Sequence, residues 1–260
     1  MDNTNHVRYK ITIVYDGTNY CGWQIQPNGV TIQEVLQEKL SVILRTPIEI
    51  TGASRTDSGV HALAQVAHFN YSPELDTYRF LASINGVLPN DIRVTEIVEV
   101  PLGFHARYSA DNKVYHYHIN LGPIQDPFKR LYSWYFPEKI NLEILSACAK
   151  EFVGTHDFTS FANEPRTGAT VKNPVRTIKR LGVIHEGTGI RLEFEGDSFL
   201  YKMVRNITGT MIEIGKGKRS IEEIRSILAA KDRRKAGRAA PPHALFLVRV
   251  EYGSRTAFGG

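Results

Sequence analysis

One short segment of the chain concentrates side chains that can do chemistry. Residues 52–69 have the sequence GASRTDSGVHALAQVAHF, which places Asp57 two residues after Arg55 and two before Gly59. A glycine-rich run this short does not form a helix, so we expect a loop held between two strands, a place where catalytic side chains often lie. The commoner role of an aspartate in such a turn is to hydrogen-bond its own backbone, and this alternative stays open.

The neighbours of Asp57 limit what its carboxylate can do. His61 and His68 follow closely, but the segment holds no second acidic residue that would complete a metal site or an acid–base pair. What remains is a lone carboxylate that a cation keeps ionised, and such a group can act as a nucleophile or as a base. The segment alone does not choose between these two roles.

The elements that must position this loop are visible as patterns around it. Alternating apolar residues predict a strand at 9–15 with one buried face. Residues 31–44 begin with a capping box at Thr31 and continue with one apolar helical face, which predicts a helix. A short strand at 48–51 and an apolar strand at 64–71 are expected to flank the loop.

The later part of the chain shows a similar order of predicted strands and helices. We expect helices at 78–84, 141–154, 201–215 and 220–230, and strands at 114–122, 190–199 and 245–252. The first of these helices is expected to stop at a left-handed cap at Asn85-Gly86, and the last to start with a capping box of Ser220 and Glu223.

The order of these elements is mixed rather than strictly alternating, which favours the α+β class. We predict two similar sheet-and-helix halves, residues 1–105 and 106–260, forming a mostly antiparallel sheet with helices packed on it. The first half carries the Asp57 loop, and the second is expected to complete the site.

Composition narrows the class of protein. The chain has 260 residues, 42% of them hydrophobic, which is enough for a buried core. No apolar stretch approaches a membrane span and the first residues lack the apolar core of a secretory signal, so we expect a cytoplasmic protein. Cys21 and Cys148 are the only cysteines, are far apart in the sequence and belong to no CxxC motif, so they indicate neither a disulfide framework nor a thiolate zinc site.

The balance of charge suits a polyanionic partner. Lys and Arg number 32 against 27 Asp and Glu, giving a net charge of +5. Residues 216–219 and 233–238 hold much of the excess, and they are candidates to contact phosphates. Solvated loops and helix ends are the alternative for each cluster.

Seven segments together point to a known family. SRTDSGVHALAQVAHF resembles the signature of the TruA-type tRNA pseudouridine synthases, in which Gly-Arg-Thr-Asp-x-Gly-Val-His precedes an apolar strand. Further segments match the family in order along nearly the whole chain: YDGTNYCGWQIQPNGVTIQEVLQ, LPNDI, FHARYSADNKVYHY, DFTSF, MVRNITGTMIEIG and AAKDRRKAGRAAPP. Ser54 and Ala244 stand where the family usually has glycine; a positive φ at position 54 would suit serine less well than glycine.

The resemblance implies the pseudouridine synthase fold and the isomerisation of uridine to pseudouridine at positions 38, 39 and 40 of the anticodon stem-loop of tRNA. It implies a homodimer that binds tRNA, and a reaction that needs neither metal nor cofactor. His116 and His118 share one face of a predicted strand, but no third ligand accompanies them, so we expect no metal site there.

The resemblance also implies roles for four residues. Asp57 would be the nucleophile, attacking the uracil ring or the sugar carbon, and Arg205 would pair with it and keep it ionised. Tyr115 would stack on the target uracil, and Arg55 would help to flip the uridine out of its stem. On pattern alone, the alternatives are a helix-surface cation for Arg205, a core or sheet-face tyrosine for Tyr115, and a salt-bridged surface arginine for Arg55.

Two other classes of function stay open. A non-catalytic RNA-binding module could use the same fold, since fold alone does not give function. A metal-dependent nuclease would need clustered acidic ligands, which the sequence does not provide.

Overall fold

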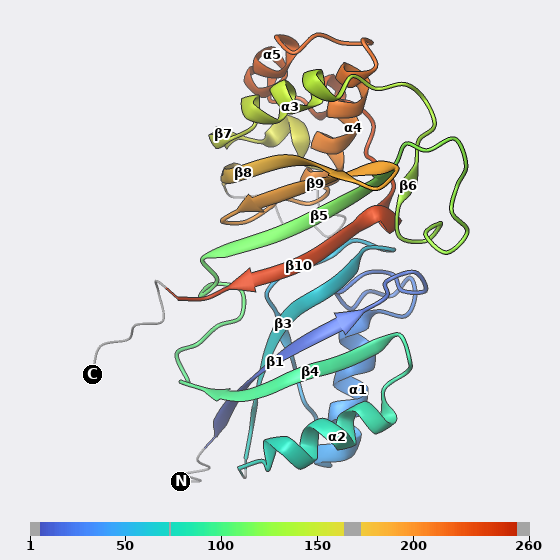
Figure 1. Cartoon of the computed structure of the whole chain (residues 1–260). Coiled ribbons are helices and arrows are strands. Elements are labelled where there is room, and N and C mark those ends of the chain that lie inside the picture. The colour runs from blue at the N-terminus through green and yellow to red at the C-terminus, as the bar shows by residue number, and fades with distance from the viewer. Residues whose placement is uncertain (1–5, 73, 164–172, 254–260) are drawn as a thin grey trace. The chain divides into compact units, whose positions relative to one another are not determined.

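The structure of the chain is a computed structural model that describes residues 6–72, 74–163 and 173–253 (Figure 1). Its strands are mostly antiparallel and helices pack on them, so the predicted α+β class is confirmed. Within the described ranges, no helix is long and apolar enough to cross a membrane.

The chain forms two compact units. Unit 1 contains the residues up to Asp111 together with those from Leu247 onward, and unit 2 is Asn112–Phe246. The predicted boundary between residues 105 and 106 lies near Asp111, where the chain first leaves unit 1. The division into 1–105 and 106–260, in which the first half carries the Asp57 loop and the second completes the site, stays a prediction.

Unit 1 is a sheet with two helices on one face (Figure 1). Its strands run in the order β4-β1-β3-β10, with the short β2 paired to β3. The elements of this unit are β1 (Val7–Tyr15), α1 (Ile32–Leu44), β2 (Thr51–Gly52), β3 (His61–Tyr71), α2 (Thr77–Val87), β4 (Ile92–Val100) and β10 (Leu245–Glu251).

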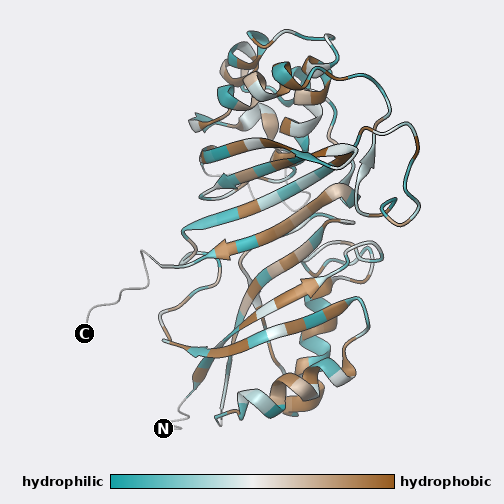
Figure 2. Ribbon diagram, viewed as in Figure 1, coloured by the Kyte–Doolittle hydropathy of each residue, from teal (hydrophilic) through white to brown (hydrophobic). Residues whose placement is uncertain are grey.

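The first strand and first helix form as predicted. Alternate residues of β1 are buried, and Figure 2 shows the matching alternation of apolar and polar residues along the strands. Thr31 Oγ1 accepts the backbone N–H of Glu34, and the Glu34 carboxylate accepts the N–H of Thr31, each at 3.3 Å. This capping box satisfies two donors that the helix would otherwise leave without partners.

Unit 2 contains the strand order β5-β9-β8-β7, with helices gathered beside these strands (Figure 1). All pairs along this path are antiparallel, and the short β6 pairs with β5 in parallel. Its strands are β5 (Asn112–Asn120), β6 (Trp134–Tyr135), β7 (Gly154–Asp157), β8 (Val175–Glu186) and β9 (Gly189–Gly196). Its helices are α3 (Leu142–Glu151), α4 (Met203–Gly215) and α5 (Glu223–Ala230), with 3₁₀ turns η1 (Thr159–Phe161), η2 (Arg233–Lys235) and η3 (Pro242–Ala244).

Two predicted helix ends are wrong. Helix α2 continues through Asn85 and Gly86. The side-chain amide of Asn85 donates to the Leu81 carbonyl within the helix, and it exchanges two hydrogen bonds with the backbone of Val94 in β4. The helix instead ends at Val87, and the residue after it, Leu88, has the extended backbone that suits a residue preceding proline.

The start of α5 also differs from the prediction. Glu223 accepts the N–H of Ser220 as a capping box requires, at 2.9 Å. The N–H of Glu223, however, donates to the Ser220 backbone carbonyl rather than to its hydroxyl. The segment before Glu223 is therefore a tight turn, and the helix begins at Glu223.

Candidate active site

The loop that carries Asp57 joins β2 to β3 in unit 1, and a buried glutamine holds its first residues. Ser54 donates its N–H to Gln65 Oε1 at 3.1 Å, and Gln65 Nε2 donates to the Ser54 carbonyl at 2.8 Å. Ser54 is not among the described non-glycine residues with a positive φ. Serine therefore fits this position without backbone strain, although the family usually has glycine there.

The segment after β1 holds the other side of the loop. Tyr15 Oη and Thr56 Oγ1 share a buried hydrogen bond of 2.8 Å. The Trp23 N–H donates to the Thr56 carbonyl at 3.1 Å, and the Gly59 N–H donates to the Tyr20 carbonyl at 3.3 Å. The backbone on both sides of Asp57 is thus bonded to a second, neighbouring segment of the chain.

Gly22 makes this close approach possible. Its φ is +88°, and a Cβ at this position would lie 2.6 Å from the Thr56 carbonyl oxygen and 3.0 Å from the Asp57 carbonyl carbon. Any larger residue would push the loop away. Gly59, with φ of 76°, makes the turn that follows Asp57.

The loop presents its two charged side chains outward. Arg55 is exposed and Asp57 half-exposed, while the alternating residues Ser54 and Thr56 are buried. A fixed backbone with an accessible carboxylate suits a group that must meet a substrate. The structure therefore brings Arg55 and Asp57 together on one rigid loop.

Tyr115 and Arg205, the other two predicted site residues, belong to unit 2. Tyr115 is buried on β5, opposite Phe194 of β9, and its ring meets Phe199 edge to face with centroids 5.2 Å apart. This environment orders the ring by contacts between aromatic side chains.

Arg205, in the first turn of α4, is tied to the segment before η3. Its Nε–H donates to the Ala240 carbonyl at 2.8 Å, and the Ala240 N–H donates back to the Arg205 carbonyl at 3.0 Å. Gly209, one turn further along α4, permits this contact, because a Cβ there would lie 1.7 Å from the Arg238 carbonyl oxygen. Arg205 is therefore a held side chain rather than a loose helix-surface cation.

A buried tyrosine lies close to this arginine. Tyr117 Oη donates to the Pro241 carbonyl at 2.8 Å. Burial raises the pKa of Tyr117 well above its usual value, and the charge of Arg205 acts in the opposite direction. The phenol stays protonated, so it serves as a hydrogen-bond donor that helps to hold the Pro241 segment.

Several of the basic residues predicted to contact phosphates also bond within unit 2, and their contact with phosphates stays a prediction. Carboxylates pair with three of them, as Lys216 with Glu138, Arg219 with Glu213, and Arg234 with Asp232. Arg233 donates to the side chain of Asn206 at 2.8 Å. The exposed members are Lys218, Arg234, Lys235 and Arg238. These clusters hold α4 and the segments after it in place, and only their exposed members are available to phosphate.

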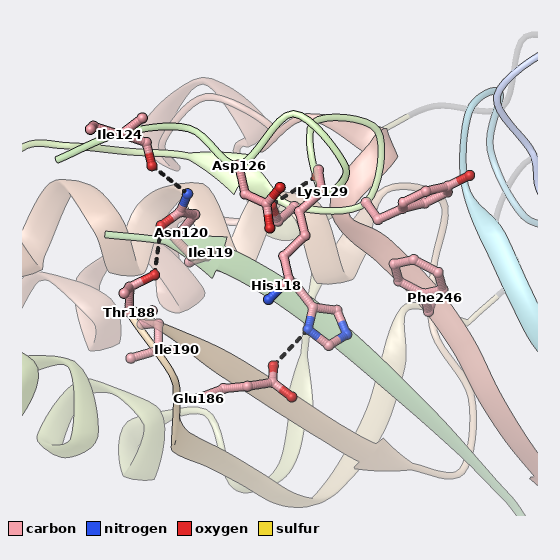
Figure 3. Close-up of a pocket in the computed structure, with 13 residues that line it drawn as sticks. His118, Ile119, Asn120, Ile124, Asp126, Lys129, Glu186, Thr188, Ile190 and Phe246 are labelled. Atoms are coloured by element: carbon pink, nitrogen blue, oxygen red, sulfur yellow. Dashed lines mark hydrogen bonds and ion pairs between the residues drawn. The ribbon is translucent and has the colours of Figure 1, made fainter. Parts of the chain in front are cut away.

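The two histidines of β5 pair with acids. His116 Nε2 lies 3.6 Å from Glu193. His118 Nδ1 lies 2.9 Å from Glu186, and both residues line a pocket of about 330 Å³ (Figure 3). Burial lowers the pKa of His118, while its bond to Glu186 acts in the opposite direction. In the part of the chain that the structure describes, no three His, Cys, Asp or Glu side chains gather as metal ligands.

Sequence reasoning missed the residues that support the loop. Gln65, Tyr15 and Thr56 act through contacts between segments up to 41 residues apart, which no local pattern reveals. The available signal was Gly22, in CGW, since glycine is the usual residue where two backbone segments approach closely.

Comparison with known proteins covers both units. The family model described as tRNA pseudouridine synthase matches residues 11–109 and 148–253. A "tRNA pseudouridine synthase A 1" of Protochlamydia amoebophila is 54% identical over 94% of this chain and 96% of its own length. Enzymes named "tRNA pseudouridine synthase A" from an Exiguobacterium species and from Citrifermentans bemidjiense are 44% and 42% identical, each over 94% of this chain and over 98% and 96% of their own lengths. With the Asp57 loop and Arg205 both inside the matched ranges, the chain belongs to the tRNA pseudouridine synthase family.

Proposed function

We propose that this chain isomerises uridine to pseudouridine in the anticodon stem-loop of tRNAs, with Asp57 as the nucleophile. The observation that carries the proposal is the loop itself. The loop is held by hydrogen bonds to Tyr15, Tyr20, Trp23 and Gln65, yet Asp57 stays half-exposed. Membership in the synthase family supplies the reaction.

The chemistry requires that a base be detached, turned and reattached. The bond from C1′ to N1 of uracil breaks and a bond from C1′ to C5 forms, after which C5 loses its proton and N1 ends with one. A carboxylate can form a covalent intermediate with either the uracil ring or C1′ and so divide this exchange into two easier steps. We propose this role for Asp57 and leave both sites of attack open.

Three further residues are proposed to act with Asp57. Arg205 supplies a positive charge that keeps the carboxylate ionised, since a neighbouring cation favours the charged form. Tyr115 stacks on the target uracil. Arg55, exposed on the same loop as Asp57, occupies the space that the flipped uridine leaves and offsets part of the lost stacking.

The finer identity of the reaction follows the family resemblance. We propose that the uridines at positions 38, 39 and 40 are the targets, that the active form is a homodimer, and that the reaction needs no metal or cofactor. The location proposed for the enzyme is the cytoplasm, where its tRNA substrates function.

The test is release of tritium from a tRNA transcript labelled at uracil C5, because C5 loses its hydrogen only when the new carbon–carbon bond forms. Wild type should release tritium without added metal, and Asp57→Ala should release none while its affinity for tRNA stays within a few fold. Asp57→Asn, which keeps the shape of the side chain, should also be inactive. Loss of tRNA binding in both variants would make Asp57 structural. A wild type that binds tRNA without releasing tritium would favour the non-catalytic binding module.

A further inference from the structure

The loop between β4 and β5 exposes an aromatic ring beside a cation. Tyr108 is 69% exposed, although it is a large hydrophobic residue. The ring of His105 lies against it with centroids 4.3 Å apart, and the guanidinium carbon of Arg107 lies 5.8 Å from the centre of the tyrosine ring. Proteins often bind single-stranded nucleic acids through an exposed aromatic ring, which stacks on a base, and an adjacent arginine, whose charge attracts the phosphates.

The backbone of this loop is fixed by its own side chains. His105 Nδ1 accepts the N–H groups of Arg107 at 3.2 Å and Tyr108 at 3.3 Å. Ser109 Oγ accepts the N–H of His105 at 3.0 Å. Tyr108 is therefore exposed by a structured turn, and little ordering remains to be done when a ligand stacks on it.

The rest of unit 1 anchors the same loop. Arg8 donates to the Phe104 carbonyl at 2.6 Å, and the Tyr252 hydroxyl donates to the Ala106 carbonyl at 2.7 Å. The Ala106 N–H donates to His68 Nδ1 at 3.1 Å. These bonds fix the position of the loop relative to the sheet of unit 1.

An apolar cluster joins this loop to the loop of Asp57. Phe104 and Ala106 pack with Ala53 and Val66 in one buried group. Ala53 is the second residue of the segment 52–69 and lies four positions before Asp57. The two loops thus have a common foundation, and a molecule bound at Tyr108 is held by the same part of unit 1 that holds Asp57.

The charge of Arg107 is available to a ligand. Within residues 6–72, 74–163 and 173–253, no ion pair engages its guanidinium. The contrast is Tyr78 on α2, which is 86% exposed and is also adjacent in sequence to an arginine, Arg79. The guanidinium of Arg79 lies 3.3 Å from the Asp76 carboxylate. Only the first of these two Tyr and Arg arrangements offers an unneutralised positive charge.

We propose that Tyr108 and Arg107 form an auxiliary RNA-binding site, in which Tyr108 stacks on one unpaired base of the substrate and Arg107 contacts a phosphate beside it. The identity of the ligand as RNA rests on the proposed function, while the site itself rests on the geometry of this loop. It lies outside the reacting centre and acts by adding affinity for an unpaired nucleotide.

The test measures the Kd for a tRNA transcript in an Asp57→Asn background, so that the RNA stays unmodified. Tyr108→Ala should weaken binding about 5- to 150-fold, the usual loss for one base–aromatic stack, and Tyr108→Phe should bind like the parent. Arg107→Gln should reduce the slope of log Kd against log salt by about 0.7, the value for one contact to a single-stranded phosphate. Tyr78→Ala, the matched control, should leave Kd unchanged.

The outcomes separate this site from the proposed reaction. Equal Kd values for Tyr108→Ala, Tyr78→Ala and the parent, with wild type releasing tritium, would overturn the site alone. A selective loss in Tyr108→Ala, with no tritium release by wild type, would support the site and overturn the reaction. Absence of any tRNA affinity would overturn both.

Discussion

The phenol oxygen of Tyr15 lies 2.8 Å from the hydroxyl of Thr56, and both groups are buried. Tyr15 is the last residue of β1, and Thr56 directly precedes Asp57 in the loop that follows β2. One hydrogen bond therefore connects the end of a central strand to the residue before the proposed nucleophile. Because the bond is buried, water does not readily replace it when one partner is removed.

Tyr15→Phe should slow catalysis more than it weakens tRNA binding. Loss of the hydroxyl costs about 1 kcal/mol of stability and lets Thr56 shift, and small misplacements of a reacting group can lower rates by up to about 100-fold. We expect kcat to fall at least severalfold with tRNA affinity within a factor of about three. Single-turnover tritium release and filter binding measure the two effects. Tyr78→Phe, which removes an exposed hydroxyl, is the control; equal rates for all three proteins would show that the bond does not position Asp57.

Gly22→Ala should damage the same loop from the opposite side. The added methyl would lie 2.6 Å from the Thr56 carbonyl oxygen, on a backbone with a φ of +88°. Left-handed backbone and overpacking each cost roughly 1 to 3 kcal/mol. We expect a lower midpoint in urea and a loss of activity larger than the loss of folded protein explains.

The matched control for this substitution is Gly86→Ala. Nothing lies within 4 Å of a Cβ at Gly86, which is inside α2. Alanine is the better helix former, so this variant should be as stable as wild type or more stable, by up to about 1 kcal/mol. Similar losses of stability and activity in Gly22→Ala and Gly86→Ala would contradict a specific role for Gly22.

Local patterns predicted those elements whose causes are local. The alternation in β1 and the capping box of α1 depend on residues within one turn or one strand, and both are confirmed. The predicted end of α2 was wrong because the Asn85 side chain hydrogen-bonds to Val94 in β4, a distant contact that sequence periodicity does not encode. The motif located the Asp57 loop, but not the distant residue Tyr15 that supports it.

The pairing of charges could not be predicted from the sequence. A run of basic residues in sequence says nothing about which carboxylates the fold brings near it. Glu213 and Asp232 neutralise Arg219 and Arg234, while Arg107, a single arginine in an unremarkable segment, carries no such partner among the described residues. The distribution of available charge is therefore a property of the tertiary structure.

Gly209→Ala tests whether the fixed position of Arg205 matters. The new methyl would lie 1.7 Å from the Arg238 carbonyl oxygen, so the segment that bonds to Arg205 must move. We expect kcat to fall about 10-fold or more and stability to drop by about 1 to 3 kcal/mol, despite the better helix propensity of alanine. Gly86→Ala again serves as the control, and a fully active Gly209→Ala would remove the contact with Ala240 from the requirements for catalysis.

His68 should make unit 1 less stable in mild acid. Burial, with the charge of Arg8 and the neighbouring His105, lowers the pKa of His68 to about 4, whereas an unfolded histidine titrates near pH 6.5. The folded state thus favours the neutral ring, whose Nδ1 accepts the Ala106 N–H. The stability that this group contributes is fully present above about pH 6.5 and is lost as the pH falls toward 4, at up to about 1.4 kcal/mol per pH unit.

Two measurements check this sign. The ring proton signals of His68 should show no titration by NMR between pH 8 and about 5, and a midpoint near 6.5 would contradict the assignment. His68→Gln retains a side-chain acceptor for Ala106 but cannot gain a proton, so its free energy of unfolding should fall less than that of wild type between pH 7 and pH 5. The same hydrogen bond anchors the loop of Tyr108. If protonation of His68 loosens this loop before unit 1 unfolds, the tRNA affinity of wild type should fall more steeply between pH 7 and pH 5 than its folded fraction does. Parallel losses of affinity and folded fraction would show that the loop and the sheet of unit 1 melt as one cooperative structure.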